Sequence, residues 1–254
     1  MSGHEFQSHF DDAEGGVDFS DESTRIDAHA IAEMQSIADR YPHKRSALLP
    51  ILHLVQSVDG RVSPAGIRIA AQIVDMTEAQ VSGVATFYTM YKRRPAGEHH
   101  VGVCTTTTCA VLGGDILMSC MERKLGIAEG QTTSDGKFSL ERLECNAACD
   151  YAPVMMVNWE FMDNMSPESA TRLLDDLAAG VPVHSTRGAE LVGWRETERV
   201  LAGFPDGRAD QGPTAGPASL LGLDIAHERG WTAPSEGPER ASTTGDEEAK
   251  LPTC

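Results

Sequence analysis

The sequence lacks a long hydrophobic run. Its longest apolar stretch, residues 47–55, contains Pro50 and His53 and is far shorter than the ~20 residues that a membrane-spanning helix needs. Residues 1–6 have neither the positive charge nor the apolar block of a secretion signal. We therefore expect a soluble, cytoplasmic chain with no direct membrane span.

Positive charge is also scarce. The 254 residues include 21 Lys and Arg against 38 Asp and Glu, a formal net charge of −17. Nucleic acid is therefore not an expected partner, because binding to phosphates requires a basic surface. Neither G-x-G-x-x-G nor G-x4-G-K-[ST] occurs, and Gly113-Gly114 is too short a signal. We predict that this chain carries no nucleotide site of its own.

Apolar spacing and composition divide the chain into segments. Helical spacing, the cap Ser63-Pro64 and a capping box of Thr77 and Gln80 predict about four short helices before residue 95. After residue 184 glycine and proline become frequent, which is typical of chain without a core of its own. The predicted segments are an acidic disordered arm (1–22), a helical bundle (23–95), an α/β domain (96–183) and a Gly/Pro-rich extension (184–254).

The segment 96–183 carries alternating strand and helix signals. They predict strands at 99–104 and 138–145, a hairpin of 154–159 and 160–163, and helices at 110–125 and 168–179. The first of these helices has one apolar stripe, formed by Leu112, Ile116, Leu117, Cys120, Met121 and Leu125. This order indicates a small α/β sandwich, so we expect an α+β protein overall.

Four cysteines form two tight pairs, Cys104-x4-Cys109 and Cys145-x3-Cys149. Each pair begins where a predicted strand ends, so the two loops face each other if those strands are neighbours. Four thiolates suit a [2Fe–2S] cluster or a structural zinc ion. In a reducing compartment either is favoured over a disulfide. The threonines between Cys104 and Cys109 can donate backbone amides to cluster sulfurs, but they also simply make a good turn.

Spacing weighs against two other kinds of site. Zinc sites most often have about two residues between paired cysteines, and a thioredoxin-type dithiol requires C-x-x-C, which is absent. A zinc-stabilised assembly module without a redox role stays open as an alternative. We expect Cys120 to be a core residue and Cys254 a free thiol. We expect His53, His99 and His100 to be structural, because four cysteines already complete a ligand set.

Several segments, in a fixed order, carry a resemblance to a known family. They are Ala47-Leu-Leu-Pro-Ile-Leu-His-Leu-Val-Gln, Val84-Ala-Thr-Phe-Tyr-Thr-Met-Tyr, the first cysteine pair, Leu125-Gly-Ile with Thr132-Thr-Ser-Asp-Gly, Glu144 with the second cysteine pair, and Ala152-Pro153. Over residues 24–183 the chain resembles the E subunit, the thioredoxin-like [2Fe–2S] ferredoxin, of NADH–quinone oxidoreductase, respiratory complex I.

This resemblance implies a helical bundle, then a thioredoxin-like ferredoxin domain, then a largely irregular C-terminal extension. It implies one [2Fe–2S] cluster held by Cys104, Cys109, Cys145 and Cys149, and no catalytic residue on this chain. Family members often have glycine in the second cysteine loop, where this chain has Asn146-Ala147-Ala148. Since alanine is disfavoured at positive φ, the loop is expected to differ in shape.

The resemblance also implies a function within a larger enzyme. The cluster would exchange single electrons with FMN, and FMN and NADH would both sit on a partner subunit. The expected partners are that flavin- and NADH-binding subunit and the large iron–sulfur subunit of the peripheral arm. The complex would place this chain peripherally on the cytoplasmic side of the plasma membrane. Equivalent subunits of NAD-linked formate dehydrogenases and hydrogenases are the alternative hosts.

The extension keeps a few large apolar residues. They are Leu191, Trp194, Phe204, Leu220, Leu221 and Trp231. Large apolar groups in chain that lacks its own core tend to mark contacts with another surface. We therefore expect the extension to dock on partner subunits.

Overall fold

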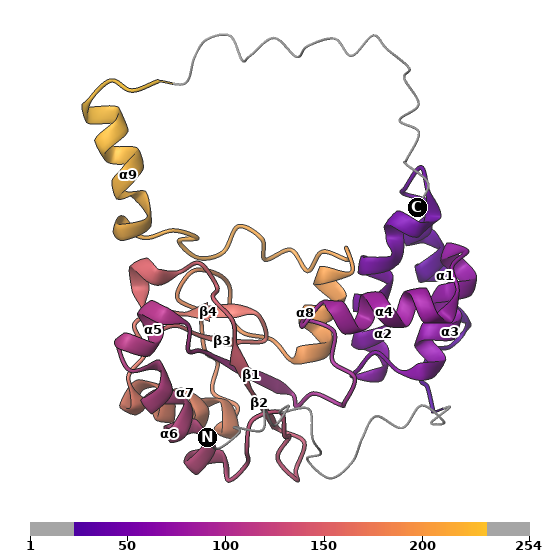
Figure 1. Cartoon of the computed structure of the whole chain (residues 1–254), viewed down its shortest axis with the longest axis horizontal. Coiled ribbons are helices and arrows are strands. Elements are labelled where there is room, and N and C mark those ends of the chain that lie inside the picture. Colours follow the sequence, from indigo (N-terminus) through magenta and orange to yellow (C-terminus); the bar gives the residue numbers. More distant parts are fainter. Residues whose placement is uncertain (1–22, 233–254) are drawn as a thin grey trace, which may run out of the picture. The chain divides into compact units, whose positions relative to one another are not determined.

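The computed structural model describes residues 23–232 (Figure 1), so the predicted acidic arm at 1–22 and Cys254 lie outside the described residues. The chain forms two compact units that divide between Thr214 and Ala215. The first unit contains the helical bundle, the sheet and α8 (Trp194–Leu201), and the second contains α9 (Pro217–Glu228). The predicted boundaries after residues 95 and 183 both fall inside the first unit.

The N-terminal half of the first unit is the predicted helical bundle. Its helices are α1 (Ala28–Ala38), α2 (Leu48–Asp59), α3 (Pro64–Val74) and α4 (Glu78–Phe87), with a short 3-10 helix at Lys44–Ala47. The predicted caps are confirmed: Ser63 Oγ accepts the Gly66 N–H at 2.9 Å, and Thr77 and Gln80 cap each other's backbone N–H. Met34, Ile37, Ile51, Leu52 and Val55 lie in the shared apolar core.

The second half is built on a four-stranded sheet in the order β2-β1-β3-β4. The strands are β1 (His99–Cys104), β2 (Phe138–Leu143), β3 (Met155–Val157) and β4 (Glu160–Met162). β1 pairs in parallel with β2 and antiparallel with β3. Asn158 and Trp159, with φ of 50° and 68°, form the two-residue turn of the β3–β4 hairpin, as tight hairpins require. The predicted order of strands and helices is confirmed.

Helices α6 (Gly114–Leu125) and α7 (Pro167–Ala179) cover one face of this sheet (Figure 1). The helix predicted at 110–125 is in fact two, because Gly113, with φ of 105°, separates α5 (Thr107–Val111) from α6. Leu112 and Ile116 are therefore 55% and 66% exposed rather than part of the buried stripe. Met118 is buried with Leu117 and Met121 instead.

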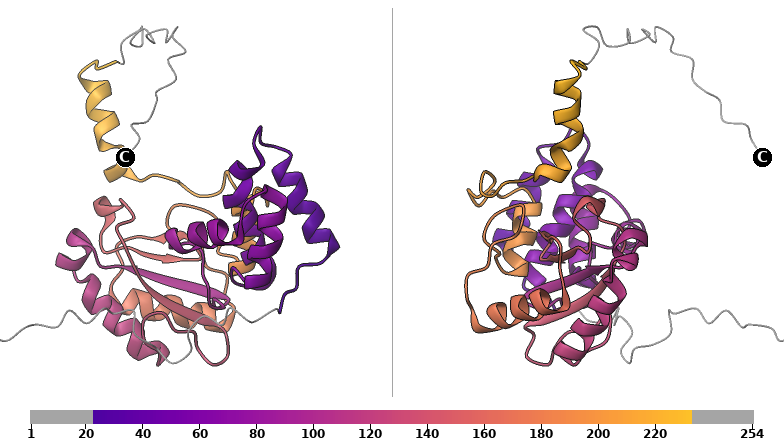
Figure 2. Two further views of the ribbon diagram at one scale, coloured as in Figure 1. Left: turned by 45° about the vertical axis from the view of Figure 1, so that its right-hand side comes forward. Right: turned by 90° about the vertical axis from the view of Figure 1, so that its left-hand side faces the viewer.

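The first part of the extension folds against the chain itself. Helix α8 packs along α2, between the helical bundle and the sheet (Figure 2). Trp194 is 2% exposed, and its ring lies 5.1 Å from that of His100 and 5.5 Å from that of Trp159. Leu191 and Phe204 also pack against the chain's own cores. The expectation that these three residues contact a partner was wrong, because they complete the fold of this chain.

Helix α9 differs from these cores in its chemistry. It has no buried residue, and Leu220, Leu221, Leu223 and the nearby Trp231 are exposed. These side chains keep their predicted role as a contact surface for a partner. Within residues 23–232, no helix combines the length and apolar character needed to cross a membrane.

Candidate metal centre

The parallel pairing of β1 and β2 brings the two cysteine loops to one edge of the sheet. Cys104, the last residue of β1, lies opposite Leu143, the last residue of β2. Cys109 follows in α5, Cys145 comes two residues after β2, and Cys149 begins the 3-10 helix η2 (Cys149–Tyr151). The condition set by the sequence, that the two strands be neighbours, is therefore met.

Cys104 and Cys109 form the inner pair, and each is 2% exposed. Burial is the main reason that the pKa of the Cys109 thiol is raised to about 11. The nearby sulfurs of Cys104 and Cys149 raise that pKa as well, while a backbone hydrogen bond from Val154 lowers it. The Cys109 sulfur therefore interacts with a cysteine from each loop, as a shared ligand site requires.

Cys145 and Cys149 form the outer pair, and both are exposed. The Ala147 N–H donates to Cys145 Sγ at 3.3 Å. Ala147 has φ of 54°, so it adopts the left-handed conformation that glycine adopts at lower cost. Ala148 is buried beside Cys104 and Cys109, which ties the outer loop to the inner pair.

A glycine that the sequence analysis did not single out shapes the inner loop. A Cβ at Gly114 would lie 2.6 Å from the carbonyl oxygen of Cys104 and 2.9 Å from that of Cys109. Both neighbours are backbone atoms, so they cannot move aside as a flexible side chain would. Gly114 therefore lets the start of α6 pack directly against the loop that carries the inner pair.

The donor set fits a [2Fe–2S] cluster. It offers four sulfurs in two pairs, and backbone N–H groups of Val154 and Ala147 donate to sulfurs of both loops. Cluster proteins use such thiolate ligands and N–H···S hydrogen bonds. In the described part of the chain, no three His, Cys, Asp or Glu side chains form a ready site for a single metal ion.

The remaining cysteine and histidines have protein partners. Cys120 is partly buried on α6, with its sulfur 3.9 Å from Thr171 Oγ1. His53 Nδ1 lies 2.6 Å from Glu198 Oε2, and His100 Nε2 lies 2.7 Å from Glu141 Oε2. These contacts agree with the structural roles predicted for them.

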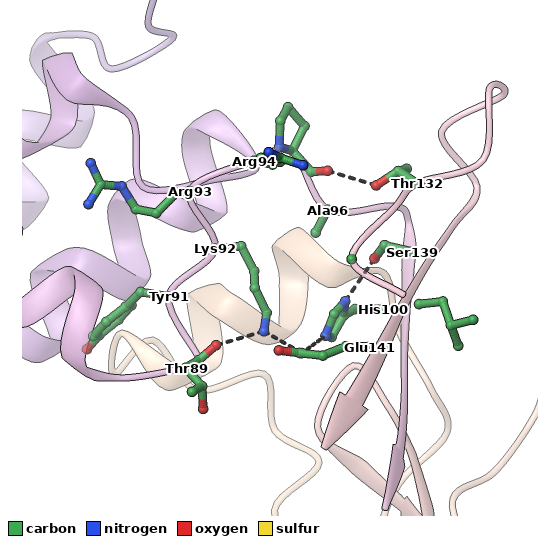
Figure 3. Close-up of a pocket in the computed structure, with 13 residues that line it drawn as sticks. Thr89, Tyr91, Lys92, Arg93, Arg94, Ala96, His100, Thr132, Ser139 and Glu141 are labelled. Carbon is green, nitrogen blue, oxygen red and sulfur yellow. Dashed lines mark hydrogen bonds and ion pairs between the residues drawn. The ribbon is translucent and has the colours of Figure 1, made fainter. Parts of the chain in front are cut away.

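A polar network that sequence reasoning missed lines a cavity of about 380 Å³ between residues 89–96 and the strands β1 and β2 (Figure 3). Lys92 and His100 both point at Glu141, and His100 Nδ1 contacts Ser139 Oγ at 2.8 Å. Burial lowers the pKa of both Lys92 and His100. These groups satisfy one another, so the network joins the helical bundle to the sheet.

Comparison with known proteins places the chain in a family. The family model described as thioredoxin-like [2Fe-2S] ferredoxin matches residues 34–178, more than half of the chain. The chain belongs to this family. The predicted resemblance and the α+β fold of a thioredoxin-like ferredoxin are thereby confirmed. Because the match ends at residue 178, α8 and α9 lie outside it.

Relatives of this ferredoxin share one name, that of the E subunit of NADH-quinone oxidoreductase. The protein of that name from Mycobacterium tuberculosis (strain ATCC 25618 / H37Rv) is 53% identical over 203 residues, which cover 80% of this chain and 81% of the relative. The protein from Rickettsia bellii (strain RML369-C) is 38% identical over 155 residues, covering 60% and 93% of the two chains. An NAD+-reducing [NiFe]-hydrogenase in the air-oxidized state is a distant structural neighbour (18% identity, TM-score 0.48, 53% of this chain and 23% of that one), too distant to bear on function.

Proposed function

We propose that this chain is the electron-transferring E subunit of an NADH–quinone oxidoreductase, carrying one [2Fe–2S] cluster on Cys104, Cys109, Cys145 and Cys149. The observation that carries the proposal is the parallel pairing of β1 with β2, which sets Cys104 opposite Leu143. It gathers both cysteine loops at one edge of the sheet, in a chain 53% identical to a protein named as that subunit.

The chain's own residues prepare the site for this role. The cluster, when bound, supplies one-electron transfer. The N–H groups that donate to sulfur favour the thiolate form of the ligands. The inner pair is buried and the outer pair is exposed, so a redox partner reaches the site from the side of Cys145 and Cys149.

The proposal assigns hydride chemistry to another subunit. NADH delivers two electrons as a hydride, whereas a [2Fe–2S] cluster exchanges one at a time, so a flavin must act between them. This sequence has no dinucleotide fingerprint, and FMN and NADH therefore belong on a flavin-binding partner. The large iron–sulfur subunit is the second partner, and the assembly lies peripherally on the cytoplasmic side of the membrane.

Exposed apolar groups offer contact surfaces for these subunits. Phe87 and Tyr88 at the end of α4 are exposed and touch edge to face, with ring centroids 5.0 Å apart. The apolar side chains of α9 are exposed as well. Specific pairing with a partner is expected to bury at least ~1,000 Å².

Metal analysis of anaerobically purified protein tests the cluster assignment. We expect about two irons and two acid-labile sulfides per chain, from the stoichiometry of the cluster, together with visible colour and an EPR signal on reduction. Zinc without labile sulfide would instead establish the assembly-module alternative.

Electron transfer is tested with NADH and ferricyanide. Cluster-loaded protein alone should show no turnover, and adding the purified flavin subunit should start it. Turnover by the lone chain without bound flavin would overturn its assignment as a dependent subunit. Turnover that requires a formate dehydrogenase or hydrogenase flavoprotein instead would change the host enzyme.

A further inference from the structure

Arg187, in the extension, reaches back to the second cysteine loop. Its Nε donates to Asp163 Oδ2 at 2.7 Å and its Nη2 donates to Asp163 Oδ1 at 2.9 Å. The guanidinium carbon lies 4.7 Å from the ring centroid of Phe161 and 5.3 Å from that of Tyr151. The side chain is only 18% exposed. Such a stacked, two-pronged arrangement requires the planar fork of arginine.

The groups that Arg187 contacts belong to the metal centre. Tyr151 and Asp150 directly follow Cys149 in η2, and Asp150 Oδ1 lies 3.7 Å from Arg187 Nη2. Phe161 packs against the small apolar cluster that contains Cys104 and Cys109. One cation therefore contacts the chain beside the outer pair and an aromatic ring that supports the inner pair.

The segment around Arg187 is itself fixed to the sheet. The Thr186 N–H donates to the Phe161 carbonyl at 2.9 Å, and Thr186 Oγ1 donates to Asp163 Oδ2 at 2.9 Å. The Thr214 N–H donates to the Arg187 carbonyl at 2.7 Å. Arg187 is thus held in place by backbone bonds, and it comes from chain that the family match, ending at residue 178, does not include.

We propose that Arg187 is a positioning residue for the second cysteine loop and that its charge makes the cluster easier to reduce. The inference rests on the proposed function, because it needs a cluster on the four cysteines. Reduction adds negative charge at the site. Without the Arg187 cation, the carboxylates of Asp150 and Asp163 would stand uncompensated near Cys149 and oppose that added charge.

Two substitutions separate charge from geometry. Arg187→Gln removes both, and Arg187→Lys keeps the charge but loses the fork and the stacking. For Arg187→Gln we expect the equilibrium constant for cluster reduction to fall roughly three- to tenfold, tenfold being about 59 mV for a one-electron couple. For Arg187→Lys we expect that constant to change less than about twofold. Both variants should lose iron to a chelator faster than the parent protein.

The chain offers a matched control in Arg199. Its guanidinium also stacks on an aromatic ring, 4.3 Å from the centroid of Phe204, and it also pairs with a carboxylate, Glu33. These partners lie in the extension and in α1 rather than beside a cysteine loop. Arg199→Gln should lower thermal stability without changing the reduction equilibrium or the rate of iron loss.

The measurements are redox titration followed by EPR, and chelator-driven loss of visible absorption, on full-length protein. Asp163→Asn provides the opposite sign and should make reduction easier, also when Arg187→Gln does not fold. Equal reduction equilibria in parent, Arg187→Gln and Asp163→Asn would overturn the inference while leaving the proposed function intact. Parent protein without iron and sulfide would overturn both.

Discussion

Cys104 and Leu143 lie opposite each other at the ends of two parallel strands. In a parallel pair both strands end at the same edge of the sheet, so the chains that leave Cys104 and Leu143 start as neighbours. The metal centre is therefore a product of strand register, and residues that allow the loops to pack closely are as necessary as the ligands themselves.

Gly114 is the first such residue. In a Gly114→Ala variant the new Cβ would meet the carbonyl oxygen of Cys104 at 2.6 Å, so we expect lower iron content and a stability loss of about 1–3 kcal/mol. Gly83→Ala is the control, because a Cβ at this helical glycine would meet nothing within 4 Å. It should stabilise the protein by up to ~1 kcal/mol. Thermal unfolding and iron assay compare the two.

Serine substitutions separate ligands from the bystander cysteine. Changing Cys104, Cys109, Cys145 or Cys149 to Ser should strongly reduce iron and sulfide content. Cys120→Ser should leave that content unchanged, because the Cys120 sulfur lies on α6 beside Thr171. Loss of iron in the Cys120 variant would show that the ligand set is wrongly assigned.

Glu198 is predicted to be a keystone of stability. It is 0% exposed and accepts hydrogen bonds from Trp159 Nε1 at 2.9 Å and from His53 Nδ1 at 2.6 Å. Glu198→Ala leaves these buried donors without a partner, and we expect the free energy of unfolding to fall by about 3 kcal/mol. Glu196→Ala, which removes an exposed cap on the same helix, should cost ~1 kcal/mol or less. Urea unfolding of both variants checks the difference.

Acidification should destabilise the protein through His100. Burial lowers the pKa of His100 in the folded state below its unfolded value of about 6.5. The unfolded chain therefore binds more protons, and stability present above that value is lost as the pH falls below it, at up to about 1.4 kcal/mol per pH unit. Urea unfolding at several pH values should show a smaller loss for His100→Gln. Ser139→Ala, which removes only the Nδ1 partner, should lower stability while keeping the pH slope.

Helix α9 is predicted to gain protection on assembly. It is 12 residues long and has no buried residue, and helices of this length are marginal in water without packing. Its amides should exchange quickly in the free protein and slowly in the complex with partner subunits. Leu221→Glu should weaken this protection while iron content stays the same. Equal exchange rates in free and assembled protein would contradict the docking role.

The sequence predicts what depends on local chemistry. The caps at Ser63 and Thr77, the strand order and the two facing cysteine loops follow from short-range patterns and were predicted correctly. The break at Gly113 was not, because the apolar spacing runs on without interruption and the need for Gly114 arises only from the carbonyls of Cys104 and Cys109.

Helix α8 escaped prediction for a different reason. Glycine and proline around it suggest chain without a core, and nothing local shows that Trp194 fits against His100 and Trp159. The role proposed for Arg187 is equally non-local, since Asp163 and Tyr151 are distant from it in sequence. Such contacts depend on tertiary structure and leave no periodic signal.

The position of α8 determines the smallest piece of this protein that can fold on its own. The family match ends at residue 178, but a truncated chain ending there would lack Trp194 and Glu198 and would expose the indole of Trp159 to water. Aggregation is the expected fate of such a fragment, because a hydrophobic surface that is normally interior becomes accessible. An autonomous domain of this ferredoxin therefore extends through α8.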